Sequence, residues 1–510
     1  MIIAMSGASG NMGREALKQT MEYDSVELMR ILLQNNKESA RFAKCLKKLY
    51  GDRIDVVFGS IHEKDVCERL VADANYVINM AAVIPPESDA NAQSSRIANA
   101  DGVIALVNAV KNCKPQPKYV HISTVALYGN RNEKHPFGRV GDPLVVSPFD
   151  VYAKDKLFGE RYVLDSDLDC WAVLRQTAML HPNMMTDNLS DGLMFHTPLN
   201  APLEWVSSRD SGYLIKRIIE RDAQEEVPNF WKKIYNIGAG YGGRCTGYET
   251  FNYGFEMIGG SAEKFFKPNW FASRNFHGMW FADSDELNNL FAYQRDTVQG
   301  YWKEIQKAHP VFSFGKFVPK SLLYIFLFKR LLYHRNSPYK WLNDRDSAKV
   351  QAYFGCADDV KKIPTVWKDT KLIAKGDYGD YAEMKKTENA EYLSHGYDED
   401  KPIEKWTIED LRQAAEFRGG QCLSEDIGKN VYKKVKWQCA EGHTFESSPY
   451  TVLRGGHWCP HCTIPEPCQF DRIAKVAPFY AQIWYDSHDQ NENCIYYIEE
   501  DGNAVMREDP

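Results

Sequence analysis

The sequence predicts an α/β fold: a doubly wound parallel sheet, a smaller substrate-binding or lid domain, and a small metal-binding module near the C-terminus. Two observations predict the sheet. The first part of the chain alternates short apolar runs with stretches of helical period, and a glycine-rich loop follows the first apolar run directly. Cysteines and histidines that cluster after residue 438 predict the metal-binding module.

Six short apolar runs are the expected strands of the sheet. Between them lie stretches with a period of about 3.6, such as 102–110, which predict helices. Strands that alternate with helices are typical of a parallel sheet covered on both faces, a Rossmann-like arrangement. The expected strands are Ile2–Met5, Val26–Leu33, Ile54–Phe58, Tyr76–Asn79, Tyr119–Ile122 and Trp171–Leu174.

Composition excludes several classes of protein. The chain has 510 residues and is 44% hydrophobic, which is too apolar for a disordered or fibrous protein. Its net charge of -7 lacks the positive field of a general nucleic-acid binder. The 12 cysteines are too sparse for a disulfide scaffold, so we expect a reducing compartment and a cytoplasmic location.

No signal peptide and no membrane span are expected. Residues 1–5 run straight into Gly7 and are interpreted as the first strand of the fold, not as a leader. The most apolar later stretch, Ser321–Phe328, is far shorter than the roughly 20 residues that a spanning helix needs.

A glycine loop follows the first expected strand and opens a helix. It contains Gly7, Gly10 and Gly13. Glycines let the backbone turn tightly and approach a phosphate, and the first turn of the helix then offers free amides at the positive end of its dipole. The loop predicts a dinucleotide site, although an ordinary turn between a strand and a helix has the same pattern.

Tyr152 and Lys156 are four residues apart and therefore share one face of an expected helix. An ammonium group beside a phenol favours the phenolate, and each unit by which the pKa falls corresponds to about 1.4 kcal/mol. Such a pair is suited to acid-base catalysis near neutral pH. The alternative interpretation is an ordinary pair on a helix surface.

Several motifs accompany this pair in a fixed order. Together they resemble the extended short-chain dehydrogenase/reductase family, whose members include NAD-dependent epimerases, dehydratases, ketone reductases and hydroxysteroid dehydrogenases. Segments 99–102, 205–210 and 234–238 are similar to later parts of the family and extend the resemblance to about residue 240. The motifs are the glycine loop, Asn79-Met-Ala-Ala82, Ile122-Ser-Thr124-Val-Ala-Leu-Tyr-Gly129, Ser147 through Glu160, and Leu174-Arg175.

The resemblance implies a role for each matching residue. Tyr152 exchanges a proton with the substrate oxygen, and Lys156 lowers the pKa of Tyr152 and binds the nicotinamide ribose. Thr124 hydrogen-bonds the same oxygen, with Ser123 as the alternative holder of that role. The residues implied to bind the cofactor are Gly7, Gly10, Asn11, Met12, Gly13, Asn35, Lys37, Ser60, Ile61, Ala81, Ala82, Ser123, Tyr152 and Lys156.

The cofactor is expected to be NADP or NAD, with NADP favoured. The second strand ends at Gln34–Lys37, without the acidic residue that binds the ribose 2′-hydroxyl of NAD and repels a 2′-phosphate. Lys37 or Arg41 is available to pair with that phosphate, or is simply a solvated charge. Ser60 stands where the family often has an aspartate that contacts adenine, so the chain departs from the pattern there.

The cysteine cluster predicts a structural zinc site. Cys439, His443, Cys459 and Cys462 supply three thiolates and an imidazole, the ligands that tetrahedral zinc takes. Reduced core cysteines are the alternative, and His457 and His461 are interpreted as bystanders. The segment resembles zinc-ribbon or treble-clef modules, but its acidic and basic residues balance, so nucleic-acid binding is not expected and a structural or protein-interaction role is favoured.

Changes in composition divide the chain into segments. The linker is acidic and packs poorly, and a helix is expected to restart at Thr407 with Asp410 in a capping box. The predicted segments are an NAD(P)-binding Rossmann-like domain over 1–240 with a substrate-site insert near 184–202, a substrate or lid domain over 241–375, an acidic linker over 376–403, a zinc-binding module over 404–465 and an acidic, aromatic tail over 466–510.

These observations favour an NAD(P)-dependent oxidoreductase that interconverts a secondary alcohol and a ketone. A nucleotide-sugar epimerase with bound NAD is the alternative, and a non-catalytic NAD(P)-binding sensor or interaction protein is another. Val125–Ala126 cannot move protons where the resembling dehydratases carry an acidic pair, so dehydration is disfavoured. The expected lid is rich in aromatic residues, which predict a bulky and apolar small-molecule substrate unless they form a core of their own. These residues are Phe265, Phe266, Trp270, Phe271, Phe276, Trp280 and Phe281. A homodimer and a protein partner at the zinc module stay open.

Overall fold

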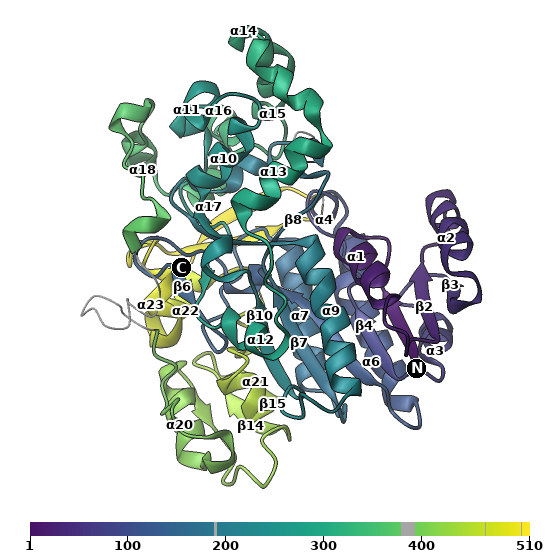
Figure 1. Ribbon diagram of the computed structural model, residues 1–510. Coiled ribbons are helices and arrows are strands. Elements are labelled where there is room, and N and C mark those ends of the chain that lie inside the picture. Colours follow the sequence, from purple (N-terminus) through teal and green to yellow (C-terminus); the bar gives the residue numbers. More distant parts are fainter. Residues whose placement is uncertain (188–190, 379–392, 465, 501, 510) are drawn as a thin grey trace.

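The structure is a computed structural model that describes residues 1–187, 191–378, 393–464, 466–500 and 502–509. Figure 1 shows a central sheet with its helices, a second lobe at the top, and a C-terminal part at the lower left. Parts of the predicted insert near 184–202 and of the predicted linker 376–403 lie outside the described residues.

A seven-stranded sheet forms the centre of the molecule, with the strand order β10-β7-β5-β4-β1-β2-β3. Every neighbouring pair is parallel, and the order reverses between β1 and β4, so the predicted doubly wound sheet is confirmed. All six predicted strands form, although one begins at Leu28, two residues later than expected. The strands are β1 (Ile2–Ser6), β2 (Leu28–Leu33), β3 (Ile54–Phe58), β4 (Tyr76–Asn79), β5 (Lys118–Thr124), β7 (Trp171–Gln176) and β10 (Lys233–Ile237).

Helices cover both faces of the sheet, because side chains along each strand alternate between two hydrophobic clusters. In β1, Ile3 and Met5 belong to one cluster and Ala4 to the other. The helices of the first face are α1 (Asn11–Thr20), α2 (Lys37–Tyr50), α9 (Ser208–Ala223) and α12 (Ser284–Phe291). Those of the second face are α3 (Lys64–Val71), α6 (Gly102–Asn112) and α7 (Val151–Leu164).

The second lobe contains two small sheets and short helices (Figure 1). The segment 205–210, expected as a strand of the family fold, ends β9 at Ser207 and then begins α9. The elements of this lobe are β6 (Phe137–Gly138), β8 (Ala178–Leu180), β9 (Pro202–Ser207), β11 (Arg244–Thr246), β12 (Trp280–Phe281), α8 (Met184–Asp187), α10 (Gly247–Glu256), α11 (Ala262–Phe265), α13 (Val298–Ala308), α14 (Lys320–Leu323), α15 (Lys329–Leu332), α16 (Pro338–Asp344), α17 (Ser347–Phe354) and α18 (Ala357–Lys362).

The aromatic residues of this lobe pack mainly on one another. Phe265, Phe266, Trp270 and Phe271 form a cluster with Phe328, in which neighbouring rings stack edge to face. Trp280 and Phe281 are fully buried elsewhere. The interpretation of these six lid residues as a substrate wall is therefore wrong, because four of them build the core of the lobe and the other two are buried away from the cavity.

The C-terminal part packs against both lobes. A single hydrophobic cluster includes Val145, Trp341, Trp437, Phe470 and Tyr496. The predicted capping box of Thr407 and Asp410 is confirmed at the start of its helix. The elements here are α20 (Ile408–Phe417), β13 (Gln421–Cys422), β14 (Val435–Gln438), β15 (Thr444–Ser447), α21 (Pro449–Leu453), α22 (Phe470–Val476), α23 (Pro478–Trp484), β16 (Cys494–Ile498) and β17 (Ala504–Glu508). Among the described residues, no helix is long and apolar enough to cross a membrane, as expected.

Candidate active site and metal centre

The glycine loop between β1 and α1 is shaped so that a ligand can approach its backbone closely. Gly7 has a φ of +73°, and a Cβ there would lie 2.5 Å from the carbonyl carbon of Met80. A Cβ on Gly13 would lie 2.1 Å from the carbonyl oxygen of Gly7. No side chain caps α1 at Gly10, so the first amides of this helix stay available to a phosphate group. The loop therefore fits the pyrophosphate of a dinucleotide.

A cavity of about 610 Å³ extends from the glycine loop into the second lobe. Its far wall includes Met194, Phe251, Phe255 and Phe276, so of the predicted lid aromatics only Phe276 is part of the lining. The cavity brings together most of the predicted site residues. Those in its lining are Gly7, Gly10, Asn11, Met12, Gly13, Ala82, Ser123, Thr124, Tyr152 and Lys156.

Five predicted cofactor residues lie outside the lining. Asn35 and Lys37 are exposed after β2, and the Ala81 amide donates to the Ser6 hydroxyl at 3.3 Å. The Ser60 hydroxyl lies 2.7 Å from Nδ1 of His62. The fifth residue, Ile61, is buried against Gly102 of α6. The cofactor roles of these five residues stay predictions.

Thr124 and Tyr152 form the first part of the candidate reactive centre. The Thr124 oxygen accepts the amide of Ala126 at 3.2 Å, and its side chain hydrogen-bonds Tyr152. Burial raises the pKa of Tyr152 to about 12, the bond with Thr124 lowers it, and the charge of Asp150 raises it further. The phenol therefore holds its proton at neutral pH.

Lys156 lies one helical turn beyond Tyr152 and is 2% exposed. Its Nζ donates to the Ile122 carbonyl at 2.5 Å. Burial lowers the pKa of Lys156 to about 8, against the opposing charge of Glu160. The charge that acts on the Tyr152 hydroxyl is that of Asp150, so the expected influence of Lys156 on Tyr152 stays a prediction for the complex with cofactor.

Asn99 supports the backbone that passes under the cavity. It lies in the π-helical turn Ile97–Asp101 and is fully buried. Its Nδ2 donates to the Val83 carbonyl at 2.8 Å, and its Oδ1 accepts the Val83 amide at 3.1 Å. The segment after β4, which contains Ala82, is therefore held by a buried side chain.

One end of the cavity is acidic, which the sequence analysis did not predict. Oδ2 of Asp150 lies 3.2 Å from Nδ1 of His277, while Oδ1 accepts the Ala153 amide and caps α7. Asp89 is open to the cavity. Its pKa is raised to about 7, first because the surrounding protein desolvates the carboxylate and second because of the charge of Asp150. Among the described residues of the lining, Lys156 is the one lysine or arginine.

Residues 3–175 match the family model described as the NAD dependent epimerase/dehydratase family. The matched segment is about a third of the chain. Its match includes the glycine loop, Thr124, Tyr152 and Lys156, which the cavity brings together. No curated protein matches the chain.

Solved structures similar to the chain include nucleotide-sugar enzymes. The dTDP-glucose 4,6-dehydratase of Bacillus anthracis, in complex with NAD, has 18% identity, with 61% of this chain and 97% of that chain covered and a TM-score of 0.45. A dTDP-glucose 4,6-dehydratase of Streptomyces venezuelae has 17% identity, coverage of 61% and 98%, and a TM-score of 0.48. The UDP-Glc/GlcNAc 4-epimerase of Campylobacter jejuni has 16% identity, coverage of 60% and 99%, and a TM-score of 0.47.

A buried polar network lies behind Lys156. Glu160 accepts the Ser123 hydroxyl at 2.5 Å and two nitrogens of Arg175 at 2.6 and 3.1 Å. His457 contacts the same carboxylate at 2.9 Å, and the Gly455 carbonyl accepts from Arg175 at 2.7 Å. Burial alone would raise the pKa of Glu160, but Arg175 and His457 hold it well below its usual range.

This network is part of a longer contact between the C-terminal part and α7, the helix that carries Tyr152 and Lys156. Asp165, just after α7, accepts the Ser447 hydroxyl at 2.8 Å, the Ser448 amide at 3.0 Å and the Thr451 hydroxyl at 2.8 Å. The C-terminal part therefore holds α7 along its whole length. The other contacts are Lys154 with Glu466, and Arg161 with the Trp458 carbonyl.

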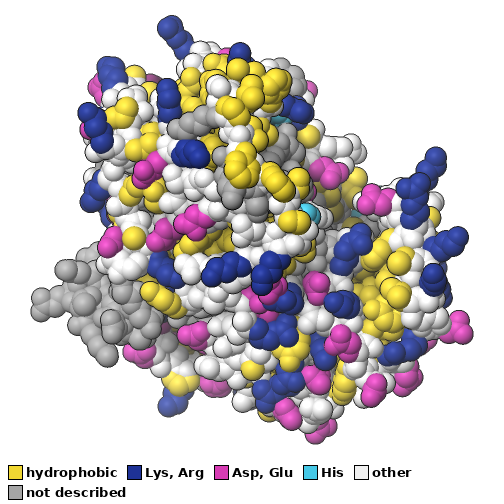
Figure 2. All heavy atoms as spheres, turned by 45° about the horizontal axis from the view of Figure 1, so that its top comes forward, with side chains coloured by type: hydrophobic (Ala, Val, Ile, Leu, Met, Phe, Trp, Pro, Cys, Tyr) yellow, Lys and Arg dark blue, Asp and Glu magenta, His cyan; other side chains and the backbone are white. Residues whose placement is uncertain are grey.

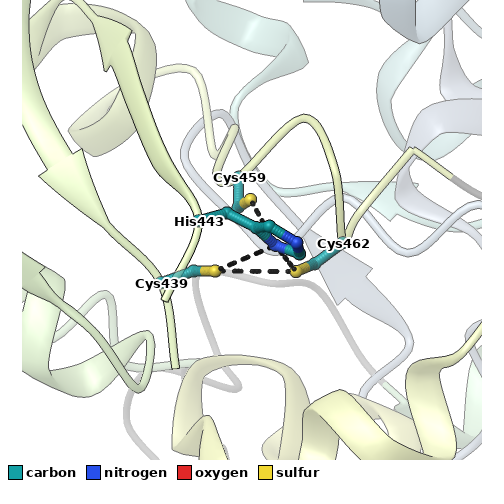
Figure 3. A group of neighbouring side chains, drawn as sticks. All are labelled: Cys439, His443, Cys459 and Cys462. Carbon is teal, nitrogen blue, oxygen red and sulfur yellow. Dashed lines mark hydrogen bonds between the residues drawn. The ribbon is translucent and has the colours of Figure 1, made fainter. Parts of the chain in front are cut away.

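The four predicted zinc ligands meet at one point, and Figure 3 shows their side chains turned toward one another. Sγ of Cys462 lies 3.6 Å from Sγ of Cys439 and 3.2 Å from Nδ1 of His443, and that nitrogen lies 3.9 Å from Sγ of Cys459. Zinc bonds of ordinary length to three sulfurs and a nitrogen require separations of about 3.5–3.8 Å between ligands. The donor set therefore fits tetrahedral zinc.

The local fold explains why the ligands converge. Cys439 and His443 lie at the turn between the antiparallel strands β14 and β15, while Cys459 and Cys462 follow α21 in one tight loop. The three cysteines are buried and His443 is exposed. A hydrogen bond from Cys462 lowers the pKa of Cys459, which favours the thiolate that a metal ion needs.

Proposed function

We propose that the chain is an NAD(P)-dependent oxidoreductase that interconverts a secondary alcohol and a ketone on a bulky, largely apolar substrate. The observation that carries this proposal is the composition of the cavity. Tyr152, Thr124 and Lys156 line one wall, and mostly apolar side chains line the rest. A nicotinamide cofactor supplies the hydride chemistry when it is bound beside these residues.

Tyr152 is the proposed proton donor in the direction of ketone reduction. A phenol whose pKa is about 12 keeps its proton at neutral pH and is able to donate it to an oxygen that gains negative charge. The Thr124 oxygen accepts the Ala126 amide and still has its own O–H donor, which we propose serves Tyr152 or the substrate oxygen. Alcohol oxidation uses the same groups in reverse.

Lys156 is proposed to orient the cofactor ribose and to favour loss of the Tyr152 proton in the oxidative direction. It has three N–H donors, and the bond to the Ile122 carbonyl uses one of them. This bond fixes the ammonium at the end of β5, beside Thr124. We infer that the remaining donors serve the ribose hydroxyls.

The charges of the cavity favour an uncharged substrate. A nucleotide sugar carries a diphosphate, which proteins bind through arginine, lysine or free backbone amides. Beyond the glycine loop the described lining offers Lys156 as its one lysine or arginine, against the carboxyl groups of Asp89 and Asp150. Apolar side chains, among them several methionines and aromatic residues, make up most of the remaining wall, which suits a large apolar ligand.

The adenosine half of the cofactor is proposed to lie over Gln34–Lys37. No aspartate or glutamate ends β2, while Asn35 and Lys37 are exposed there. This arrangement supports NADP over NAD, because a carboxylate at that position would repel a 2′-phosphate. We further propose that the bound zinc is structural, since its ligand set leaves no position for a substrate.

A substrate screen tests the proposal. Cyclic ketones and hydroxysteroids are compared with nucleotide sugars by NAD(P)H absorbance, with chromatographic analysis of products to detect epimerisation that leaves the cofactor unchanged. We expect turnover with apolar ketones. Turnover confined to a nucleotide sugar would support the epimerase instead, and cofactor binding without turnover of either class would support a sensor.

A further inference from the structure

An apolar tip projects from the second lobe. Nine of the sixteen exposed large hydrophobic side chains in the described part of the chain lie between residues 311 and 333. Phe314 is 65% exposed, Ile325 56% and Phe326 77%. Figure 2 shows hydrophobic side chains gathered on the face that Figure 1 labels α14 and α15, with lysines and arginines at the margin.

The helical run through α14, the π-helical turn Tyr324–Phe328 and α15 is apolar on both sides. Phe328, Leu331 and Leu332 are buried in the aromatic core of the lobe. On the opposite side, Leu322, Ile325 and Phe326 are exposed. A helix at a protein surface ordinarily carries polar residues on its outer side, so an apolar outer side marks a contact surface.

The charges around the tip have one sign. From residue 305 to residue 343 the sequence contains seven lysines and arginines and no aspartate or glutamate. Lys329 and Arg330 are both exposed and directly follow the apolar outer side of the helical run. This concentration of positive charge occurs in a chain whose net charge is -7.

We propose that the apolar tip binds the surface of an anionic lipid bilayer. Exposed aromatic and aliphatic side chains enter the boundary between headgroups and acyl chains, while flanking basic residues pair with anionic headgroups. The described helices are too short or too polar to span, so the contact is interfacial. A second copy of the chain is disfavoured as the occupant, because two such basic surfaces repel each other.

The tip is joined to the cavity by the aromatic core of the lobe. The ring of Phe255, which lines the cavity, lies 6.3 Å from that of Phe328 on the helical run. Insertion of the tip therefore brings the cavity close to the bilayer. This part of the inference rests on the proposed function, since an apolar substrate dissolved in lipid would enter from that side.

Vesicle flotation of the full-length protein tests the inference. We expect it to float with vesicles of phosphatidylcholine and phosphatidylserine at least about tenfold more than with phosphatidylcholine alone, and less at high salt. The double variants Ile325→Ser with Phe326→Ser, and Lys329→Glu with Arg330→Glu, should each reduce binding by about tenfold or more. Thermal unfolding and cofactor affinity should not change, because these side chains are exposed.

Matched variants on α2 are the controls. Leu49→Ser, at a side chain that is 66% exposed, and Lys47→Glu with Lys48→Glu should leave vesicle binding unchanged. Absence of vesicle binding would overturn the inference, as would binding that the tip variants do not affect. Sedimentation velocity adds a third outcome: a dimer that Phe326→Ser dissociates would assign the tip to self-association. None of these measurements depends on turnover, so they do not test the proposed function.

Discussion

The imidazole of His457 lies 2.9 Å from the carboxylate of Glu160, one helical turn beyond Lys156. His457 belongs to the loop that carries two of the zinc ligands, while Glu160 belongs to the helix that carries Tyr152. The same carboxylate holds Arg175 and Ser123. The metal-binding module and the proposed reactive centre are therefore consecutive parts of one buried network.

Replacement of His457 should weaken both stability and turnover. His457→Leu removes one buried partner of Glu160, and we expect it to lower the free energy of unfolding by about 1–3 kcal/mol. His457→Gln keeps an N–H donor and should show a smaller loss. Denaturant unfolding and steady-state rates measure the two effects. His461→Gln, an exposed neighbour without this contact, is the control, and an equal effect there would contradict the role of the network.

Tyr152→Phe should reduce turnover by about 100-fold or more while cofactor affinity stays nearly unchanged. The change removes the hydroxyl and keeps the ring, so the packing of α7 is preserved. Cofactor affinity is measured by fluorescence titration, and turnover on a substrate from the screen. Unchanged turnover would show that the proton comes from another group, of which Asp89 is the first to examine.

Lys156 makes stability depend on pH in one window. Its pKa is about 8 in the folded chain and 10.5 when free, so the unfolded chain binds more protons between these values. Stability from this residue is therefore present above pH 10.5 and is lost as the pH falls through about 8. We expect the difference in unfolding free energy between the native chain and Lys156→Met to change by about 3 kcal/mol across the window. If the unfolding free energies of the two proteins changed with pH in parallel, the pKa of the buried Lys156 amine would not be shifted.

Loss of zinc should loosen α7 as well as the module. Elemental analysis should find one zinc per chain, and Cys459→Ser should lose it. Because the module contacts α7 along its length, hydrogen exchange in 151–164 should then become faster. Cys468→Ser changes another buried cysteine outside the ligand group and should keep the metal. Faster exchange confined to the module would show that the two parts are independent.

Gly7→Ala should abolish cofactor binding, since the new Cβ would lie 2.5 Å from the Met80 carbonyl carbon. Gly428 is a matched control, because it has a φ of +71° and nothing within 4 Å of its Cβ position. Alanine at either position is strained because φ is positive, but only Gly7→Ala also clashes with the Met80 carbonyl. Fluorescence titration with NADPH and NADH compares the two variants and also tests the preference for NADP. Equal affinities in the two variants would remove the glycine loop from the site.

Local patterns in the sequence were sufficient for the sheet and for the part of the cavity wall formed by the glycine loop, Thr124, Tyr152 and Lys156. Period, turn residues and the glycine loop are encoded within short stretches, so β1 to β5 and the pair Tyr152 and Lys156 were predicted. The four zinc ligands could also be predicted from the sequence, because the spacing of the cysteines and the histidine is itself the pattern that indicates a metal site. The capping box at Thr407 belongs to the same class of local pattern.

Contacts between distant segments could not be predicted in this way. Glu160 and His457 each have an ordinary local explanation, and only the fold shows that they meet. Asp89 enters the cavity from the short helix Glu87–Ala90 and His277 from a loop, and neither position belongs to a sequence motif. The lid aromatics had the right composition for a ligand wall, but the same composition also builds a core, and packing decided between the two.

The contact of Arg175 with Gly455 joins residues 280 positions apart, and that of Glu160 with His457 joins residues 297 positions apart. At ordinary rates of protein synthesis, Glu160 leaves the ribosome about 15–60 s before His457 does. During that interval the ion pair of Glu160 and Arg175 lacks its contacts with His457 and Gly455, and α7 lacks the C-terminal part that packs against it. The contacts of Glu160 and Arg175 with the zinc-ligand loop therefore form only after residue 457 has been made.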